Sequence, residues 1–191
     1  MHDVANRVVS NDSEELILVD EDDRDIGSLN KAHCHDGDGV LHRAFSLFLF
    51  NDKGELLLQQ RSADKRLWPL YWSNTCCSHP RLGEDMTTAT RRRLEEELGI
   101  DAETEFVYKF TYQARFGAAG SENELCWVFL GRCNDKPVVN RTEIAAIRLI
   151  SVADLNDDLE SRPEIYTPWF KMEWQRLLDQ HAETLRNYSN V

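Results

Sequence analysis

The hydrophobic residues of this chain fall into short runs separated by polar turns, a pattern typical of a β-sheet with a few helices. The apolar runs 43–50 and 55–61 are joined by Asn51-Asp52-Lys53-Gly54, whose residue types favour a hairpin turn. The runs 106–116 and 122–133 flank a loop of small residues and predict a second pair of strands. Further strands are expected at 15–20 and 143–151, and a turn at 21–25 with Gly27.

Helical periodicity is clearest over residues 84–98, and Gly99 follows at the position where many helices end. Ala89, Arg93 and Glu97 are spaced one turn apart and therefore share one face of this helix. Three other segments are expected: a short helix at 152–159, a long amphipathic helix at 167–186, and an ordered irregular segment at 62–83.

The order of these elements predicts a single domain of the α+β class. Strands and helices mix without a regular βαβ rhythm, and the chain has neither an internal repeat nor a Gly-rich nucleotide loop. We therefore expect a mixed β-sheet flanked by helices over residues 16–191. Residues 1–15 are polar, and we expect them to form a flexible N-terminal extension.

An excess of acidic side chains limits what the protein can bind. The 191 residues include 34 acidic and 22 basic side chains, for a formal net charge of −12. Such a surface repels nucleic acid and anionic membranes, so a bound anion requires a cleft in which lysines and arginines are concentrated. We expect a small-molecule ligand and a monomeric protein, with neither nucleic acid nor a membrane as partner.

Features that govern localisation favour the cytoplasm. No apolar run approaches the length of a membrane span, and the first residues lack the basic and apolar regions of a signal peptide. The five cysteines, which include the adjacent Cys76 and Cys77, are odd in number and do not suggest a disulfide framework. A reducing cytoplasmic environment is therefore expected.

Histidines and carboxylates in polar contexts form a candidate metal site. Glu122 and Glu124 lie two residues apart in a predicted strand, so their side chains point to the same face. Together with His35, His42 and His79 they could fill most of an octahedral site for a divalent ion. The alternative is that these are surface histidines beside a solvated acidic strand end, because no compact metal-binding motif is present.

A thiol beside an imidazole in Cys77-Ser78-His79 is a second candidate for chemistry. A nucleophilic or acid–base cysteine needs a partner within hydrogen-bond reach. The alternative is a small buried apolar residue, which is the usual role of a free cysteine. Because Cys76 is adjacent, only one of the two side chains can face a given cleft.

Residues 92–100, Arg-Arg-Leu-Glu-Glu-Glu-Leu-Gly-Ile, resemble the core of the Nudix box, whose helix holds a divalent metal against a diphosphate. The sequence departs from the box at Ser78, which replaces a glycine, and at Arg93, which replaces a glutamate. A positive charge at Arg93 weakens metal-assisted activation of water but suits direct contact with a phosphate. An ordinary solvated helix of mixed charge is the alternative. The box glutamates correspond to Glu84, Glu96 and Glu97.

Residues 72–80, Trp-Ser-Asn-Thr-Cys-Cys-Ser-His-Pro, resemble the catalytic cysteine segment of the type 1 isopentenyl-diphosphate isomerases, a branch of the Nudix fold. The resemblance extends from about residue 16 to the last helix. The combination of Cys77-Ser78-His79 with Glu122-Asn123-Glu124 is far more discriminating than either half. Other family signatures follow in the same order: Lys31, His35, His42-Arg43-Ala44-Phe45, Arg61, Lys65, Trp68-Pro69, Arg93, Glu97, Tyr112 and Thr167-Pro168-Trp169.

The resemblance implies a Nudix-like fold with two metal sites and a basic diphosphate site. Glu97 would hold a Mg²⁺ that bridges to the substrate diphosphate. The diphosphate oxygens would be bound by four cations: Lys31, Arg61, Lys65 and Arg93. One further divalent metal, Mn²⁺, Zn²⁺ or Mg²⁺, would be bound by five residues: His35, His42, His79, Glu122 and Glu124.

The resemblance also implies an isomerase that interconverts isopentenyl and dimethylallyl diphosphate. Cys77 would be one acid–base group, Glu124 and Tyr112 would form the other on the opposite face of the alkene, and Trp169 would lie near the allylic carbons. A Nudix diphosphate hydrolase is the alternative, although Arg93 and Ser78 count against it. A non-catalytic metal- or diphosphate-binding module is a third hypothesis.

Overall fold

A computed structural model of the protein describes residues 6–189. Nine strands in this part of the chain form one mixed sheet: β1 (Glu15–Val19), β2 (Asp25–Asn30), β3 (His42–Phe50), β4 (Leu56–Arg61), β5 (Trp72–Ser73), β6 (Cys76–Ser78), β7 (Thr104–Arg115), β8 (Ser121–Arg132) and β9 (Ile144–Ile150). The helices are α1 (Lys31–Cys34), α2 (Met86–Leu98), α3 (Val152–Ser161), the 3₁₀ helix η1 (Pro163–Ile165), α4 (Pro168–Gln180) and α5 (Ala182–Arg186).

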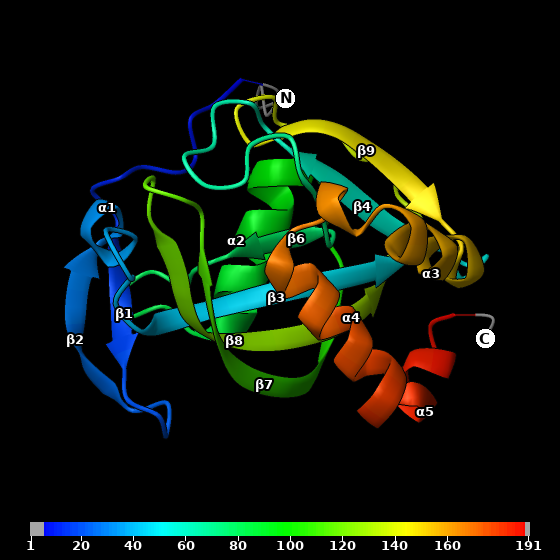
Figure 1. Ribbon diagram of the computed structural model, residues 1–191. Helices are drawn as coiled ribbons and strands as arrows, with labels where there is room; N and C mark the ends of the chain where they lie inside the picture. Colours follow the sequence, from blue (N-terminus) through cyan, green and yellow to red (C-terminus); the bar gives the residue numbers. More distant parts are fainter. Residues whose placement is uncertain (1–5, 190–191) are drawn as a thin grey trace.

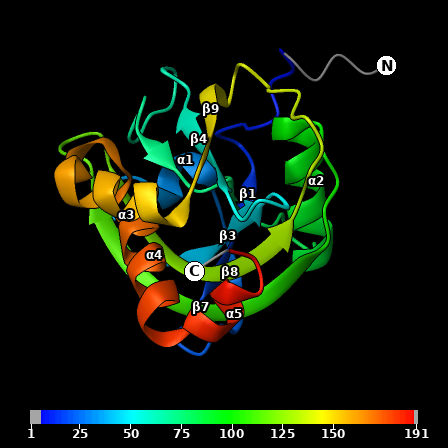
Figure 2. The ribbon, with the colours of Figure 1, turned by 90° about the vertical axis from the view of Figure 1, so that its right-hand side faces the viewer.

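The sheet lies between two helical layers, with α2 on one face and α3 and α4 on the other (Figures 1 and 2). The alternation of side chains along β3 supplies both cores. Phe45 and Leu47 pack on the α2 side, whereas Ala44 and Phe48 pack on the α4 side. All four are essentially excluded from solvent. The prediction of a single α+β domain with a mixed sheet flanked by helices is therefore confirmed.

The predicted hairpin of β3 and β4 is correct at its turn but wrong along its length. The two strands pair only at Phe50 and Leu56, beyond which they separate. Thr75 fills the gap, because its hydroxyl accepts a 2.9 Å hydrogen bond from Leu49 N and donates one of 2.6 Å to Leu57 O. Instead, β3 pairs with β8 in parallel and with β6, while β4 pairs with β9.

Two other elements differ from the sequence prediction. Gly27 lies within β2, a strand that was not predicted because the acidic residues before it indicated a turn. The helix expected over 167–186 is broken at His181, between α4 and α5. The His181 ring stacks on that of Tyr108, with 4.7 Å between ring centroids, and the chain turns there back toward the sheet. This stacking contact is made at the residue where the predicted single helix is interrupted.

The segment before β1 lies along the body of the protein. The Val9 side chain is buried, and its carbonyl oxygen accepts a 2.9 Å hydrogen bond from Arg93 Nη1. Residues 1–5 of the proposed flexible extension 1–15 lie outside the described residues. The flexibility of this extension stays a prediction, but the described contacts place part of it beside the site described next.

Candidate active site

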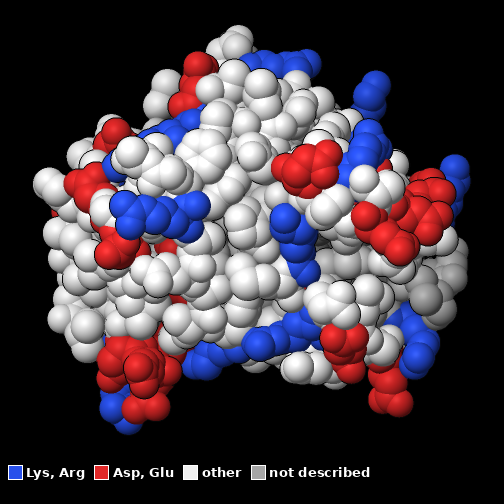
Figure 3. All heavy atoms as spheres, viewed as in Figure 1, with Lys and Arg blue, Asp and Glu red and all other residues white. Residues whose placement is uncertain are grey.

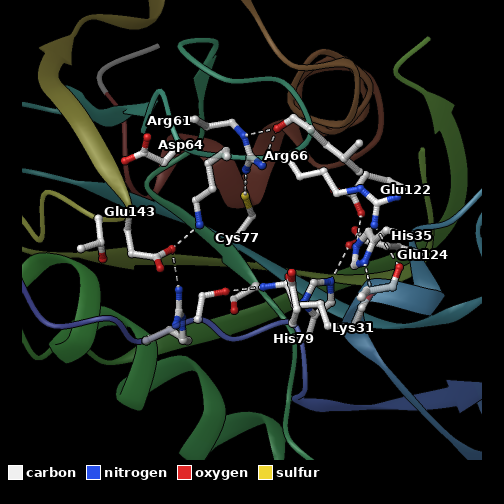
Figure 4. A pocket seen from close by; sticks show the side chains of 18 of the residues that line it. Lys31, His35, Arg61, Asp64, Arg66, Cys77, His79, Glu122, Glu124 and Glu143 are labelled. Atoms are coloured by element: carbon white, nitrogen blue, oxygen red, sulfur yellow. Dashed lines mark hydrogen bonds and ion pairs between the residues drawn. The ribbon is translucent and has the colours of Figure 1, made fainter. Parts of the chain in front are cut away.

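A pocket of about 430 Å³ opens beside the start of β8 and the loop that follows β4 (Figure 4). Its volume falls in the range of sites for small ligands. Except for His42 and Glu97, which lie behind its wall, every predicted site residue lines it: Lys31, His35, Arg61, Lys65, Cys77, His79, Arg93, Tyr112, Glu122, Glu124 and Trp169.

The five predicted metal ligands meet at one end of this pocket. One ligand atom from each of His35, His42, His79, Glu122 and Glu124 lies within 4.8 Å of all the others. His35 Nε2 is 2.8 Å from Glu122 Oε2, and His79 Nε2 is 2.9 Å from Glu124 Oε1. His42 Nε2 and His79 Nε2 are 3.1 Å apart. Four of the five residues are buried, so the cluster is not a solvated surface group.

Strand pairing explains how these residues meet. The parallel register of β3 and β8 places His42 directly beside Glu124. Glu122 precedes Glu124 by two residues in β8, so both carboxylates share a face, as predicted. His79 follows β6, which pairs with β3 on its other edge, and His35 follows the short helix α1.

Backbone carbonyls orient two of the imidazoles. His35 Nδ1 lies 2.7 Å from Lys31 O, and His42 Nδ1 lies 2.7 Å from Val40 O. Because a carbonyl can only accept, each Nδ1 carries the proton and each Nε2 presents a lone pair to the cluster. Glu122 Oε2 is buried without a hydrogen-bond donor although it touches His35 Nε2. A shared cation would satisfy both this oxygen and the Nε2 atom of the neutral imidazole.

The pKa shifts of His79, Glu122 and Glu124 also suit a metal. Burial lowers the pKa of His79 well below its ordinary value, and the neighbouring His42 lowers it further. Burial opposes ionisation of Glu122 and Glu124, but nearby histidines outweigh it, so the pKa of each carboxyl is lowered. Burial also lowers the pKa of His35, yet the Glu122 carboxylate raises it overall. Three imidazoles and two carboxylates suit a borderline divalent ion.

A carboxylate, a phenol and a thiol line the same pocket. Tyr112 Oη donates a 2.5 Å hydrogen bond to Glu124 Oε2. Burial raises the pKa of Tyr112 well above its ordinary value, and Glu124 adds to this effect. Burial raises the pKa of Cys77 to about 12, against the opposing influence of the Arg61 guanidinium. Both Tyr112 and Cys77 are therefore protonated proton donors at neutral pH.

The two adjacent cysteines face opposite sides of the sheet. They lie in the extended strand β6, where side chains alternate. Cys76 is fully buried in the core beside α2, whereas Cys77 lines the pocket. Adjacent side chains in extended backbone point to opposite faces, and the positions of Cys76 and Cys77 agree with this expectation.

Arg61 lies at the thiol end of the pocket rather than among the other cations. Its Nη2 donates a 2.9 Å hydrogen bond to Leu67 O, and its Nε donates one of 3.1 Å to Trp68 O. Its Nη1 is 3.9 Å from Cys77 Sγ, and the guanidinium carbon lies 5.1 Å from the ring centroid of Trp169. Arg61 thus shapes the wall of the pocket around the thiol.

Lys65 and Arg93 are tied to buried carboxylates, whereas Lys31 Nζ donates a hydrogen bond to Ser10 Oγ. Arg93 Nη2 lies 2.5 Å from Glu97 Oε1 and 3.1 Å from Glu143 Oε2, and Lys65 Nζ also contacts Glu143. Burial opposes ionisation of Glu143, but Lys65 and Arg93 lower its pKa to about 2. Burial together with repulsion from Lys65 and Arg93 lowers the pKa of Lys31 to about 8. Basic side chains thus gather in the pocket, next to the buried carboxylate of Glu143.

The outer surface offers no comparable concentration of one charge on the face shown in Figure 3. Acidic and basic side chains form separate small groups there, and neither sign makes a continuous patch. The basic residues that can hold an anion together line the pocket instead.

Sequence reasoning missed two polar residues that line the pocket, Glu143 and Arg66, and one buried carboxyl outside its lining, Glu173. Glu143 was seen only as the start of a strand, because nothing local links it to Arg93, 50 positions away. Glu173 is a fully buried carboxyl on α4 whose pKa burial raises to about 8. Arg66 lines the pocket and joins three segments of chain. For Glu173, a charged residue on the apolar face of a predicted amphipathic helix was the available signal.

Known proteins resemble this chain in sequence over most of its length. Residues 40–170 match the NUDIX domain family. The chain is 44% identical over 174 residues to isopentenyl-diphosphate Delta-isomerase 1 of Photorhabdus laumondii, which covers 90% of this chain and 99% of that protein. It is 43% identical over 157 residues to the isopentenyl-diphosphate Delta-isomerase of Serratia proteamaculans, covering 82% of this chain and 87% of that protein.

Solved structures resemble it in fold. DR0079 from Deinococcus radiodurans superposes with a TM-score of 0.66 at 21% identity, covering 92% of this chain and 99% of that one. A MutT protein from Methanosarcina mazei superposes with a TM-score of 0.61 at 18% identity, covering 74% and 95%. At this level of identity the likeness concerns the fold alone.

Proposed function

The chain belongs to the isopentenyl-diphosphate Delta-isomerases of the Nudix superfamily, and on that premise we propose how its residues interconvert isopentenyl and dimethylallyl diphosphate. One observation carries the assignment of roles. Glu124 presents one carboxylate oxygen to the histidine cluster and accepts a hydrogen bond from Tyr112 on the other, while Cys77 lines the same pocket.

The reaction moves a carbon–carbon double bond by one position. A proton is added at C4 and another is removed from C2, so the double bond passes from C3–C4 to C2–C3 with no net change in atoms. The intermediate is a tertiary carbocation, which water would capture. A pocket that excludes water and presents an aromatic face stabilises such a cation. Trp169, which is 2% exposed and lines the pocket, supplies that face.

We assign the two proton transfers to groups on opposite faces of the alkene. Glu124 with Tyr112 forms one group and Cys77 forms the other, so the substrate need not rotate between the steps. Trp169 Nε1 donates a 3.1 Å hydrogen bond to Ser73 Oγ, which holds the indole in place. Arg61 beside Cys77 favours the thiolate that results when the thiol gives up its proton.

The five-residue cluster is proposed to hold one divalent metal, Mn²⁺, Zn²⁺ or Mg²⁺. The buried Glu122 Oε2, which lacks a hydrogen-bond donor, and the Nε2 atoms that His35 and His42 turn toward the cluster support this assignment. A bound divalent ion supplies positive charge that makes a proton on Glu124 more acidic. The imidazoles keep that carboxylate oriented, and the neutral His79 offers the form that binds metals.

The diphosphate is proposed to bind where the cations gather. Lys31, Lys65 and Arg93 offer charge-assisted hydrogen bonds to its oxygens, and Arg61 closes the site beside the alkene. Glu97 is proposed as a residue that would hold Mg²⁺, whose charge would help to bind the diphosphate, since Mg²⁺ is commonly bound by one or two carboxylates together with substrate phosphates. In the structure this carboxylate lies behind Arg93 and pairs with it.

The Nudix hydrolase alternative is disfavoured by what Arg93 does. Its guanidinium contacts Glu97 at 2.5 Å, Glu143 at 3.1 Å and Glu96 at 3.3 Å. Of these carboxylates, Glu96 and Glu97 correspond to glutamates of the Nudix box, which a hydrolase would use to hold the metal ions that activate water. Arg93 itself stands where the box has a further glutamate, so the positive charge there weakens activation of water and suits contact with a diphosphate.

Incubation with isopentenyl diphosphate, Mn²⁺ and Mg²⁺ in deuterium oxide tests the proposal. We expect dimethylallyl diphosphate carrying deuterium at the former C4, detected by NMR, with no release of phosphate. Cys77→Ala serves as the matched control and should produce almost none. Release of phosphate without the allylic product would overturn the proposal in favour of the hydrolase.

We further propose that the protein works as a monomer in the cytoplasm. All five cysteines are free, which suits a reducing compartment. Within residues 6–189, no helix is both long and apolar enough to cross a membrane. Light scattering after size exclusion should give a mass near 22.2 kDa, and a mass of twice that value would contradict the monomer.

A further inference from the structure

Arg66 connects three separate segments at the rim of the pocket (Figure 4). It follows Lys65 in the loop after β4, and each of its three guanidinium nitrogens donates one hydrogen bond. Nε donates to Ala119 O at 2.9 Å, and Nη1 donates to Ala32 O at 3.0 Å. Nη2 donates to Asp36 Oδ1 at 2.6 Å.

The acceptors of Arg66 surround a metal-ligand candidate. Ala32 and Asp36 lie on either side of His35 in the chain, and Ala119 belongs to the β7–β8 loop that leads to Glu122. This loop already touches the turn, because Ser121 N donates a 3.0 Å hydrogen bond to His35 O.

The approach between loop and turn is close enough to require glycine at one position. Gly120 has a φ of +137°, and a Cβ atom there would lie 2.1 Å from His35 O. That hypothetical atom would also lie 3.2 Å from Arg66 Nη2. The loop, the turn and the guanidinium therefore form one closely packed unit.

We propose that Arg66 is a positioning residue of the metal centre, because its guanidinium fastens the His35 turn to the β7–β8 loop that carries Glu122. The inference rests on the proposed metal centre. Its physical basis is the planar fork of arginine, which can serve three acceptors in fixed directions, whereas a lysine ammonium acts as a point charge. The Arg66–Asp36 ion pair is half exposed, so its charge alone contributes little.

The chain offers a matched control in Arg115, the last residue of β7 before the β7–β8 loop. Arg115 donates to Gly117 O at 3.1 Å and to Asp38 Oδ1 at 2.8 Å. It thus joins the β7–β8 loop to the same turn region, but its acceptors do not adjoin His35. Removing Arg115 removes a comparable surface contact without loosening the ligand.

The experiment measures the dissociation constant of Mn²⁺ by competition with a chelating dye, using the full chain. We expect both Arg66→Ala and Arg66→Lys to bind Mn²⁺ on the order of tenfold more weakly, as happens when partners of metal ligands are lost. Arg115→Ala should bind as the unchanged protein does. Excess Mn²⁺ should restore the turnover of Arg66→Ala, because only metal occupancy is lost.

The outcomes separate the inference from its premise. If the unchanged protein fails to bind Mn²⁺, both the metal centre and this inference are overturned. If it binds Mn²⁺ and Arg66→Ala binds equally well, only the inference is overturned. If Arg66→Lys binds Mn²⁺ as tightly as the unchanged protein, a positive charge is enough and the planar guanidinium is not required. This result would also contradict the inference. Thermal unfolding of the metal-free variants shows whether each is folded. If Arg66→Ala is unstable, Arg66→Lys still tests the inference.

Discussion

Tyr112 Oη donates a hydrogen bond of 2.5 Å to Glu124 Oε2, and both side chains are buried. The other oxygen of Glu124 lies 2.9 Å from His79 Nε2. Because burial keeps the phenol protonated, Tyr112 acts as the donor and Glu124 as the acceptor. A single carboxylate thus joins the histidine cluster to a proton donor, and a change at either end tests a different part of the mechanism.

Replacing Tyr112 with Phe removes the donor and keeps the aromatic ring. We expect kcat to fall about 10²-fold, the lower range for losing a positioned proton-transfer group, because Glu124 loses its partner. Metal affinity should stay unchanged, since Tyr112 is not among the clustered ligands. Steady-state kinetics and metal analysis of the purified variant measure both quantities. Loss of metal alongside activity would mean that Tyr112 supports the cluster instead.

The cysteine pair offers an internal control. We expect Cys77→Ala to lose about 10²- to 10⁴-fold in kcat while it folds and retains its metal. Cys76→Ala should keep kcat and lose about 1 kcal/mol of unfolding free energy, because Cys76 packs in the core beside α2. Kinetics and denaturant unfolding of both variants distinguish them. Near-normal turnover in Cys77→Ala would remove the thiol from the mechanism.

Removing one imidazole tests the metal cluster. His79→Ala should lose the metal and the activity together, because His79 Nε2 lies within 3.1 Å of atoms of both His42 and Glu124. His33→Ala is the matched control, since His33 is exposed and lies outside the cluster. Elemental analysis of the two purified variants gives the metal content. Full metal content in His79→Ala would exclude this assignment.

Lys31 predicts a pH dependence of diphosphate binding. Burial and the nearby Lys65 and Arg93 lower its pKa to about 8, so Lys31 is charged below that pH and neutral above it. Affinity for inorganic diphosphate is therefore expected to be fully present below about pH 8 and to fall as the pH rises through this value. Titration calorimetry across the range measures it.

Lys31→Arg provides the control for this effect, because a guanidinium stays protonated throughout the range. The decline above about pH 8 should be absent from this variant. An identical decline in both proteins would assign the pH dependence to another group. The two curves therefore test the titration of Lys31 itself rather than the presence of a positive charge.

Local sequence determined much of the fold. Gly99 ends α2 in the left-handed conformation with a φ of 63°, as glycine after a helical run predicts. Alternation in extended chain placed Glu122 and Glu124 on one face and sent Cys76 and Cys77 to opposite faces. These features depend on neighbouring residues only, so residue type and spacing suffice to predict them.

Residue identity also indicated the site, but it left the chemistry open. Spacing alone did not distinguish a metal cluster from surface histidines around His35 and His42. The resemblance to a known family favoured the metal cluster over surface histidines. In the structure the candidate ligand atoms lie within 4.8 Å of one another. Only the folded chain shows that Glu122 Oε2 is buried without a hydrogen-bond donor.

Tertiary structure decided which distant segments meet. The turn after β3 predicted a hairpin, but Thr75 and β6 occupy the edge of β3 that β4 was expected to fill, and β8 pairs in parallel along the opposite edge. That register sets His42 beside Glu124, and a similar long-range contact sets Glu143 against Arg93. Partner choice among strands depends on the packing of the whole sheet against its helices, because many pairings satisfy the same local pattern. The sequence therefore determined which groups could act, and the packing of the sheet decided which of them meet.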